Sequence, residues 1–365
     1  MSIGLLMIYQ RRNDILALLA DGSICKWDGR TQAISPEIMC TDTVSVLKVC
    51  ISPSIIAALT IDGRFLVGLQ GAYRLEDKTA FIREILCHDS HDVIKGLYVF
   101  DHSILVNTEA RICVIRDVWM FGKAINDISE FQASLYDIPS GINLISFNDG
   151  HGFLRTNDNI LHSMGCNVRW QLGVPYHDQV RDSNKPRPSW VRYPYKLHIA
   201  DFDDTENIRE IVCGYLVTLF LMKNGSVRAG GAVVRGSEYE HSGVYFSQLE
   251  FPEGVHIAKI ATGHLLIMFA STDGQCYCMD VHDRAQAIPN GFIPILVEPL
   301  AGHYVENMFV FNEFVIILYD GGKVCALWLS RSCIERRRLT APNQYRAPTS
   351  YSSEPERPSL PRVFQ

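Results

Sequence analysis

The stretch NDNILHSMGCNVRWQLG at residues 157–173 contains the local pattern that organises this chain. A turn at Asp158 and Asn159 is followed by a short apolar segment with Ile160 and Leu161. Turn residues such as Asn and Gly between apolar runs indicate a β-hairpin, because they accept the backbone angles that tight turns require. One hairpin would leave the fold open, but the same hairpin recurs along the whole chain.

Seven copies of this hairpin align on the second residue of the turn, which we call the anchor. The residues six before and two after the anchor are apolar in every copy, and the residue four before it is apolar in six of the seven. A spacing of two on each side of a turn is the period of a β-strand, so each copy predicts two antiparallel strands. The anchors are Gly22, Gly63, Ala110, Asn159, Gly225, Gly274 and Gly322.

Repeats of roughly 40–50 residues that each hold antiparallel strands are typical of a β-propeller, in which neighbouring units bury each other's faces. We therefore predict an all-β fold over residues 1–335, a seven-bladed β-propeller of four-stranded antiparallel blades. Phe153, Leu219 and Ile316, each six residues before an anchor, should be buried at equivalent places. Because the chain begins close to the first hairpin, we expect a strand from its C-terminal end to complete the first blade and so remove an exposed sheet edge.

Two alternatives stay open within this architecture. The third copy has Glu109 and Ala110 in its turn, so six repeats with a decorated connector would also fit the pattern. A WD-repeat propeller is the second alternative, although the pair Trp27 and Asp28 does not recur in the other copies.

Composition and charge narrow the classes of function. The formal net charge of −6 and the pI of about 6.1 argue against a general nucleic-acid or membrane-surface binder. The longest apolar runs, such as residues 215–222, are too short to span a bilayer. Arg11 and Arg12 follow the first apolar stretch, which is the wrong order for a secretory signal. We therefore expect an intracellular monomer, cytoplasmic or nuclear, with reduced thiols.

The cysteines indicate packing positions. Cys25, Cys113 and Cys325 all lie three residues after their anchors, and a position shared by repeats favours a structural role for a buried thiol. Cys276 and Cys278 with His282 form the one metal-like cluster, but zinc sites usually need a second pair of ligands at a defined spacing. We predict no metal there.

No pattern of catalytic residues emerges from the sequence. The twelve histidines are scattered, and the motifs of hydrolases, phosphate-binding loops and zinc proteases are absent from the sequence. His102 and His151 share one position in their repeats, which favours buried structural histidines over ligands. We predict no catalytic residue, no cofactor and a function other than enzymatic turnover.

One interval between anchors is longer than the others and predicts an insertion at residues 174–206. Its first half is basic and aromatic and its second half is acidic, and loops on a rigid scaffold often hold binding residues. We predict that the first half contacts a protein partner, whereas the alternative is that it pairs with Asp201, Asp203 and Asp204. Residues 336–365 are rich in proline and should be a disordered tail. The predicted partner-binding residues are Lys185, Arg187, Trp190, Arg192, Tyr193 and Tyr195.

The end of the fourth repeat resembles the repeat of the regulator-of-chromosome-condensation family. Met164 and Trp170 depart from that pattern, where the family has Trp and Gly, and the other repeats keep little of the signature. The resemblance covers residues 1 to about 330 and implies a seven-bladed β-propeller. The matching positions are Gly165, Asn167, Gln171, Leu172 and Gly173.

The resemblance implies two functions. Family members include protein-interaction modules, so the first hypothesis is a non-enzymatic scaffold that binds a protein partner. The founding member is an exchange factor for the small GTPase Ran, so the alternative is guanine-nucleotide exchange on a Ran-like small GTPase. Chromatin association is a minor hypothesis, because phosphate neutralisation needs clustered Lys and Arg.

Overall fold

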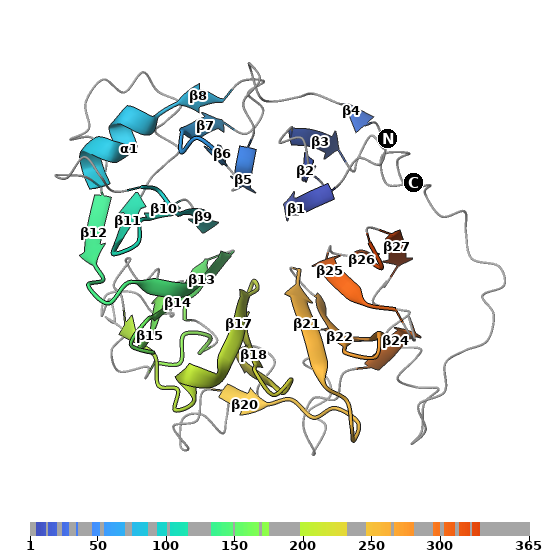
Figure 1. Ribbon diagram of the computed structural model, residues 1–365. Helices are drawn as coiled ribbons and strands as arrows, with labels where there is room; N and C mark the ends of the chain where they lie inside the picture. Colours follow the sequence, from blue (N-terminus) through green and yellow to red (C-terminus); the bar gives the residue numbers. More distant parts are fainter. Residues whose placement is uncertain are drawn as a thin grey trace, which may run out of the picture. The chain divides into compact units, whose positions relative to one another are not determined.

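The computed structural model describes the strands of the chain and most of the turns that join them (Figure 1). The predicted partner-binding residues and the predicted tail lie outside the described residues. Those described are residues 5–11, 14–19, 24–28, 34–35, 46–51, 55–69, 75–86, 93–100, 103–115, 133–148, 150–167, 170–174, 198–231, 246–263, 266–280, 295–299, 303–310, 314–321 and 323–328.

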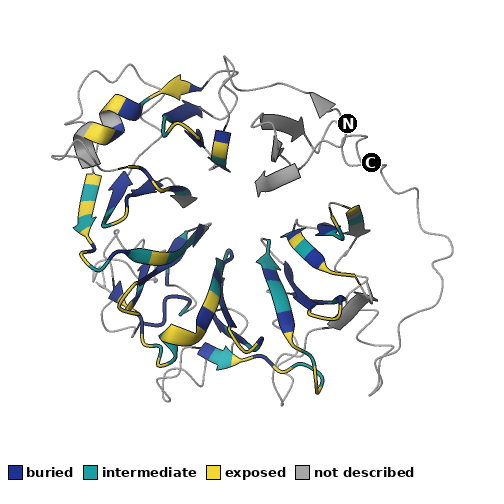
Figure 2. Cartoon of the chain, in the orientation of Figure 1, coloured by how far each residue is buried: buried dark blue, intermediate teal, exposed yellow. Residues whose placement is uncertain are grey.

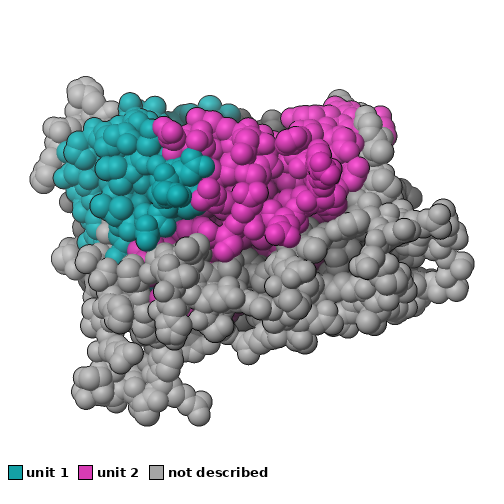
Figure 3. All heavy atoms as spheres, turned by 90° about the horizontal axis from the view of Figure 1, so that it is seen from below, with its two compact units in different colours: residues 1–168, 176–205 teal, residues 169–175, 206–365 magenta. Residues whose placement is uncertain are grey.

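The chain forms two compact units (Figure 3). Unit 1 comprises residues 1–168 and 176–205, and unit 2 comprises residues 169–175 and 206–365. Each unit is a series of separate antiparallel sheets whose strands are hydrogen-bonded in sequence order or its reverse. We number the sheets one to seven along the chain.

Unit 1 contains sheets one to four, each with four strands. One helix, α1 (Thr79–Leu86), lies between the second and third sheets in the sequence. The strands are β1 (Leu5–Arg11), β2 (Asp14–Leu19), β3 (Ile24–Asp28), β4 (Ile34–Ser35), β5 (Val46–Ile51), β6 (Ile55–Thr60), β7 (Phe65–Leu69), β8 (Glu76–Asp77), β9 (Gly96–Phe100), β10 (Ser103–Asn107), β11 (Arg111–Ile115), β12 (Ala133–Asp137), β13 (Ile142–Asn148), β14 (His151–Thr156), β15 (Leu161–Gly165) and β16 (His198–Ile199).

Unit 2 contains sheets five to seven, and the seventh sheet has three strands within the described residues. A short 3-10 turn, η4 (Thr205–Asn207), precedes the first strand of sheet five. The strands are β17 (Ile208–Cys213), β18 (Val217–Met222), β19 (Val227–Gly231), β20 (Phe246–Gln248), β21 (Ile257–Thr262), β22 (Leu266–Ser271), β23 (Gln275–Asp280), β24 (Ile295–Pro299), β25 (Val305–Val310), β26 (Phe314–Tyr319) and β27 (Lys323–Trp328).

The middle strands hold the core of each unit, as the dark-blue segments of Figure 2 show. Phe153, Leu219 and Ile316 have exposed fractions of 0%, 0% and 1%, so their predicted burial is confirmed. Apolar clusters join the second sheet to the third, the third to the fourth, and the sixth to the seventh. The middle strands β10, β14, β18 and β22 are buried along their whole length, so both of their faces are covered.

Three expectations about chain organisation need correction. The first sheet is completed by β4 of its own N-terminal segment, and no C-terminal strand joins it among the described residues. The predicted insertion is not entirely a loop, because it contains β16, whose two residues His198 and Ile199 form the fourth strand of the fourth sheet. Helix α1 was not predicted; its Ile82 is buried in the cluster between the second and third sheets.

The third hairpin differs from the others in register. In the six other sheets the residues four before and two after the anchor are paired across the hairpin. In the third sheet Ile112 pairs with Asn107, so this turn is one residue shorter. A slip of one residue reverses the face of a side chain. Consequently Asn107 takes the pairing place that the alignment gave to Val106, and Leu105 takes the place that it gave to Ile104. Ile104 and Val106 pack towards the second sheet, whereas Leu105 packs towards the fourth.

Candidate interaction surface

The six residues predicted to bind a partner lie outside the described residues, so their role stays a prediction. The acidic half of the insertion is described, and Asp201 and Asp203 are exposed. The structure thus leaves both accounts of the insertion open, and the candidate surface below is built from other residues.

The signature of the fourth repeat is a packing element. Gln171 is fully buried, and the Thr218 hydroxyl donates a hydrogen bond of 2.8 Å to its backbone oxygen. Gly173 has a φ of +63°, and a Cβ added there would lie 2.3 Å from the Phe246 ring. These residues therefore fix the segment 170–174 against sheet five, within unit 2, and are not presented to a partner.

The cysteines at the shared repeat position have the predicted structural role where they are described. Cys113 is fully buried in the cluster between the second and third sheets, and Cys325 packs against the cluster between the sixth and seventh. Burial raises the pKa of Cys113 to about 12, which keeps its thiol protonated. A buried neutral thiol acts as a small apolar side chain.

The predicted metal-like cluster is divided between described and undescribed residues. Cys276 and Cys278 are fully buried among apolar side chains of the sixth and seventh sheets, whereas His282 lies outside the described residues. In the part of the chain that the structure describes, His, Cys, Asp and Glu side chains form no group of three suited to a metal ion. The two thiols contribute to packing.

His151 is fully buried beside Phe153, with ring centroids 6.4 Å apart in an edge-on arrangement. Burial lowers the pKa of His151 to about 3, because the surrounding apolar groups disfavour the charged ring. The neutral side chain is therefore part of the core, as its shared repeat position predicted.

We expect this histidine to make folding sensitive to mild acid. The unfolded chain binds a proton at His151 below about pH 6.5, whereas the folded chain does so only near pH 3. Stability should therefore fall as the pH falls through this range, by about 1.4 kcal/mol per pH unit. Denaturant unfolding at several pH values measures this slope.

His151→Gln is the matched variant, because its amide keeps a polar side chain but cannot titrate. In this variant the free energy of unfolding should change less steeply with pH, by about 1.4 kcal/mol per pH unit, because one fewer proton is taken up on unfolding. His162, whose pKa is also lowered by burial, contributes in the same range and should keep its contribution. An unchanged slope in His151→Gln would show that the buried-neutral state is wrong.

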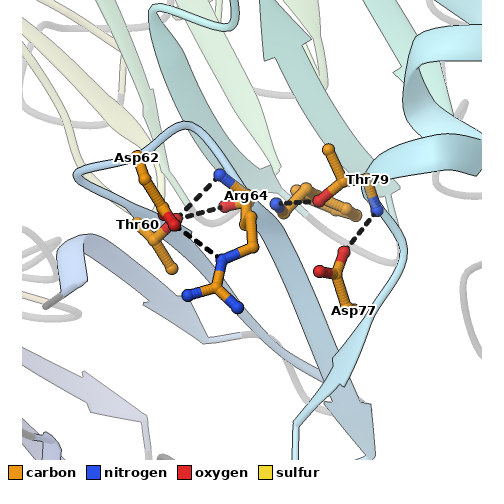
Figure 4. A network of polar contacts seen from close by, with 6 residues as sticks. Thr60, Asp62, Arg64, Asp77 and Thr79 are labelled. Carbon is orange, nitrogen blue, oxygen red and sulfur yellow. Dashed lines mark hydrogen bonds and ion pairs between the residues drawn. The ribbon is translucent and has the colours of Figure 1, made fainter. Parts of the chain in front are cut away.

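The hairpin turns of unit 1 are braced by a recurring polar network, drawn for the second sheet in Figure 4. The Thr60 hydroxyl forms a short hydrogen bond with the Asp62 carboxylate and accepts one of 2.7 Å from the Arg64 amide. This hydroxyl lowers the pKa of Asp62. The arrangement recurs with Thr156 and Asp158 in the fourth sheet.

The turns of sheets two to four in unit 1 lie on one side. Strands β5 and β9 each begin beside the hairpin turn of their own sheet. The Lys48 ammonium, in the third position of β5, lies over the Tyr98 ring, in the third position of β9. The Ile142 amide, at the start of β13, donates a hydrogen bond of 3.2 Å to the oxygen of Glu109 in the third turn. We call this side the turn surface of unit 1.

Large apolar side chains are exposed on the turn surface. Leu47 lies in a β-bulge opposite the end of β6 and is 53% exposed. Ile61, in the second turn, is 68% exposed, and Val93, three residues before β9, is 62% exposed. Bulges often redirect a side chain at a sheet edge. The turn surface therefore presents three apolar groups on braced backbone.

Consecutive antiparallel sheets with their strands in sequence order define the class of β-propellers. Comparison with solved structures finds this fold. Prp20p from Saccharomyces cerevisiae is 15% identical, with a TM-score of 0.61, over 92% of this chain and 85% of that protein. Human WBSCR16 is 12% identical, with a TM-score of 0.61, over 88% of each chain.

A third similar structure is the β-propeller domain of Cps50 (Swd1) from Myceliophteria thermophila. It is 10% identical, with a TM-score of 0.51, over 90% of this chain and 97% of the domain. The fold is thus all-β and a seven-bladed β-propeller, as predicted. Because Prp20 is yeast RCC1, the resemblance to the regulator-of-chromosome-condensation family is confirmed at the level of the fold.

In the sequence comparisons, no family model and no curated protein matches this chain. Among the described residues, no helix is long and apolar enough to cross a membrane. One fold supports many functions, so a function must be argued from the surface itself.

Proposed function

We propose that this protein is a non-enzymatic scaffold that binds a protein partner through the turn surface of unit 1. The observation that supports it is the exposure of Leu47, Ile61 and Val93, at 53%, 68% and 62%, at one end of two adjacent sheets. Single exposed apolar residues are ordinary, but several together with polar neighbours are typical of a protein interface.

The surroundings of these side chains suit binding. The second turn is held by the hydrogen bonds of Thr60, and Asp62 and Arg64 form an ion pair of 2.8 Å beside Ile61. An interface built on such a braced turn loses little conformational entropy when a partner binds. Charged groups at the rim of an apolar centre fix the orientation of the partner.

The proposal includes the expectations that accompany a scaffold. It requires no catalytic residue, metal or cofactor, and its partner is a protein and neither a nucleic acid nor a membrane. An intracellular monomer, cytoplasmic or nuclear, fits a chain with eleven cysteines and a buried, protonated thiol at Cys113.

Quantitative capture with the full chain as bait tests the proposal. We compare the wild type with the double variant Ile61→Asp and Val93→Asp, because buried carboxylates at an interface oppose binding. Ile199→Asp is the matched control, since Ile199 is 69% exposed but lies on β16 at the edge of the fourth sheet.

We expect partner proteins that the wild type and Ile199→Asp capture alike and that the double variant captures about tenfold less. Thermal melts confirm that all three baits are folded. Equal capture by all three baits, or no enrichment over beads without bait, would contradict the proposal. A fourth bait with Trp190→Ala and Arg192→Ala tests whether the insertion contributes to the same interface.

Guanine-nucleotide exchange on a Ran-like small GTPase is the second candidate. Its support is the similarity to Prp20p, whose solved structure is described together with its binding to Gsp1p and histones. A nucleotide-release assay on a panel of small GTPases separates the candidates. Accelerated release would favour exchange, and unchanged release across the panel would leave the scaffold.

A further inference from the structure

One register position on the first strand of each sheet differs in charge from sheet to sheet. A residue at this position pairs with the end of the second strand, directly before the turn that joins the second strand to the third. In six sheets the position directly follows a β-bulge in the first strand. Each bulge increases the twist of its strand at that point. The residues at this position are Met7, Lys48, Gly96, Leu144, Glu210, Lys259 and Asn307.

In unit 2 the cation at this position has an internal counter-charge. Lys259 and Glu210 occupy the position in neighbouring sheets, on β21 and β17. Burial raises the pKa of Glu210, and the positive charges of Lys259 and Arg209 oppose this rise. Lys259 is therefore balanced by a carboxylate within its own unit.

In unit 1 the cation at this position has neutral neighbours. Met7 and Gly96 occupy the position in the sheets before and after that of Lys48. Among the described residues no carboxylate forms an ion pair with Lys48, and Cys50 is the one titratable group whose charge acts on it. Burial accordingly lowers the pKa of Lys48, because its ammonium has lost hydration without gaining a carboxylate.

An aromatic side chain orients this ammonium. The Lys48 nitrogen lies 3.4 Å from the centroid of the Tyr98 ring, on β9 of the next sheet. The Tyr98 ring in turn packs on Phe147 of β13, with centroids 6.0 Å apart. Two residues after Lys48, the Cys50 thiol donates a hydrogen bond of 3.3 Å to the backbone oxygen of Leu97, and this bond joins β5 to β9. The Lys48 ammonium is thus positioned by contacts among β5, β9 and β13, the first strands of sheets two, three and four.

The Lys48 and Tyr98 side chains are not fully enclosed. Lys48 and Tyr98 are both partly exposed, and β5, β9 and β13 are the edge strands of their sheets. Lys48 directly follows Leu47, an exposed residue of the turn surface. A carboxylate that approached Lys48 would meet a partly dehydrated cation, where charge-assisted hydrogen bonds are stronger than in water.

We propose that Lys48 and Tyr98 form a binding site for a carboxylate of an acidic segment on the protein partner. The inference rests on the proposed scaffold function and adds the charge of the segment that the scaffold recognises. The aromatic ring holds the ammonium in place, and the incoming carboxylate supplies the counter-charge that Glu210 supplies to Lys259.

The test uses the full chain with its lysines dimethylated by 13C-formaldehyde, and an acetylated, amidated hexaglutamate peptide as the probe. The Lys48 signal is assigned by its loss in Lys48→Met, and the Tyr98 ring should shift it upfield. We expect the peptide to shift this signal in a saturable way and to raise the pKa of Lys48, because the peptide binds the charged form.

Variants separate this site from general charge attraction. Isothermal titration calorimetry measures the affinity of each variant for the peptide, because variants at position 48 lack the Lys48 signal. Lys48→Met should bind the peptide about tenfold more weakly, and Lys48→Arg should retain most of the affinity. Lys95→Met, at an exposed lysine two residues after Val93, should leave the affinity unchanged. Tyr98→Leu should abolish the upfield shift and weaken binding while the ammonium is kept. Melting curves identify any variant that fails to fold. If Lys48→Met fails to fold, the loss of affinity in Tyr98→Leu is the informative comparison.

Several outcomes would overturn the inference. Equal affinity of Lys48→Met and wild type would do so, as would equal losses in Lys48→Met and Lys95→Met. Displacement of the peptide by an equal concentration of inorganic phosphate would show a general anion site instead of a carboxylate site. The capture experiment tests the scaffold function separately. If Lys48→Met captures the partner as well as the wild type does, only the acidic segment is contradicted. If the peptide binds but no protein is captured, the scaffold function is contradicted.

Discussion

Phe153→Ala is expected to lower the free energy of unfolding by about 3–5 kcal/mol. Phe153 lies in the middle of β14, has an exposed fraction of 0% and contacts the ring of His151 edge-on. Removing a buried aromatic side chain loses its burial and leaves a cavity that close-packed neighbours fill only in part. Urea unfolding followed by tryptophan fluorescence and circular dichroism measures the change.

Leu47→Ala is the control for this prediction, because Leu47 is 53% exposed on the turn surface. Its truncation should change the free energy of unfolding by no more than about 0.5 kcal/mol. Similar stabilities of Phe153→Ala and wild type would show that the equivalence of the repeats has been placed wrongly. Leu219→Ala and Ile316→Ala extend the test to unit 2, where the exposed fractions are 0% and 1%.

Gly165→Ala should be the second most damaging substitution, with a loss of at least about 2 kcal/mol. Gly165 ends β15 with a φ of +108°, in a region that side chains rarely adopt. An added Cβ would lie 2.3 Å from the Gly150 oxygen and 2.6 Å from the His151 Cα. Both atoms are backbone atoms, at the first residue of the paired strand β14 and the residue before it, and they cannot rotate away.

Gly254→Ala separates the clash from the backbone strain. Gly254 has a φ of +81° and nothing within 4 Å of an added Cβ, so it reports the strain alone. Its substitution should cost about 1–2 kcal/mol. Denaturant unfolding of both variants gives the comparison, and a Gly165→Ala variant no less stable than Gly254→Ala would contradict the clash.

The short-range features of the fold could be read from the sequence. A hairpin needs a residue with positive φ at its turn, and Asn159 and Gly225 have φ values of +63° and +81° at the predicted anchors. Apolar residues at a spacing of two then place the buried positions, as Phe153 shows. The threonine hydroxyl that braces the turns was not predicted, although the same Thr and Asp spacing occurs at Thr60 and Asp62 and at Thr156 and Asp158.

The sequence by itself determined the repeat, the turns and the buried faces, because these depend on residues within one hairpin. Only the tertiary structure decided the shortened third turn, the β-bulges, the closure of the fourth sheet by β16, and the meeting of Lys48 with Tyr98. The last two join residues that lie far apart in the chain, and their pairing depends on packing between strands distant in sequence. Local propensity contains no information about such partners, so the sequence alone could not predict the proposed carboxylate site, which depends on how the second and third sheets pack.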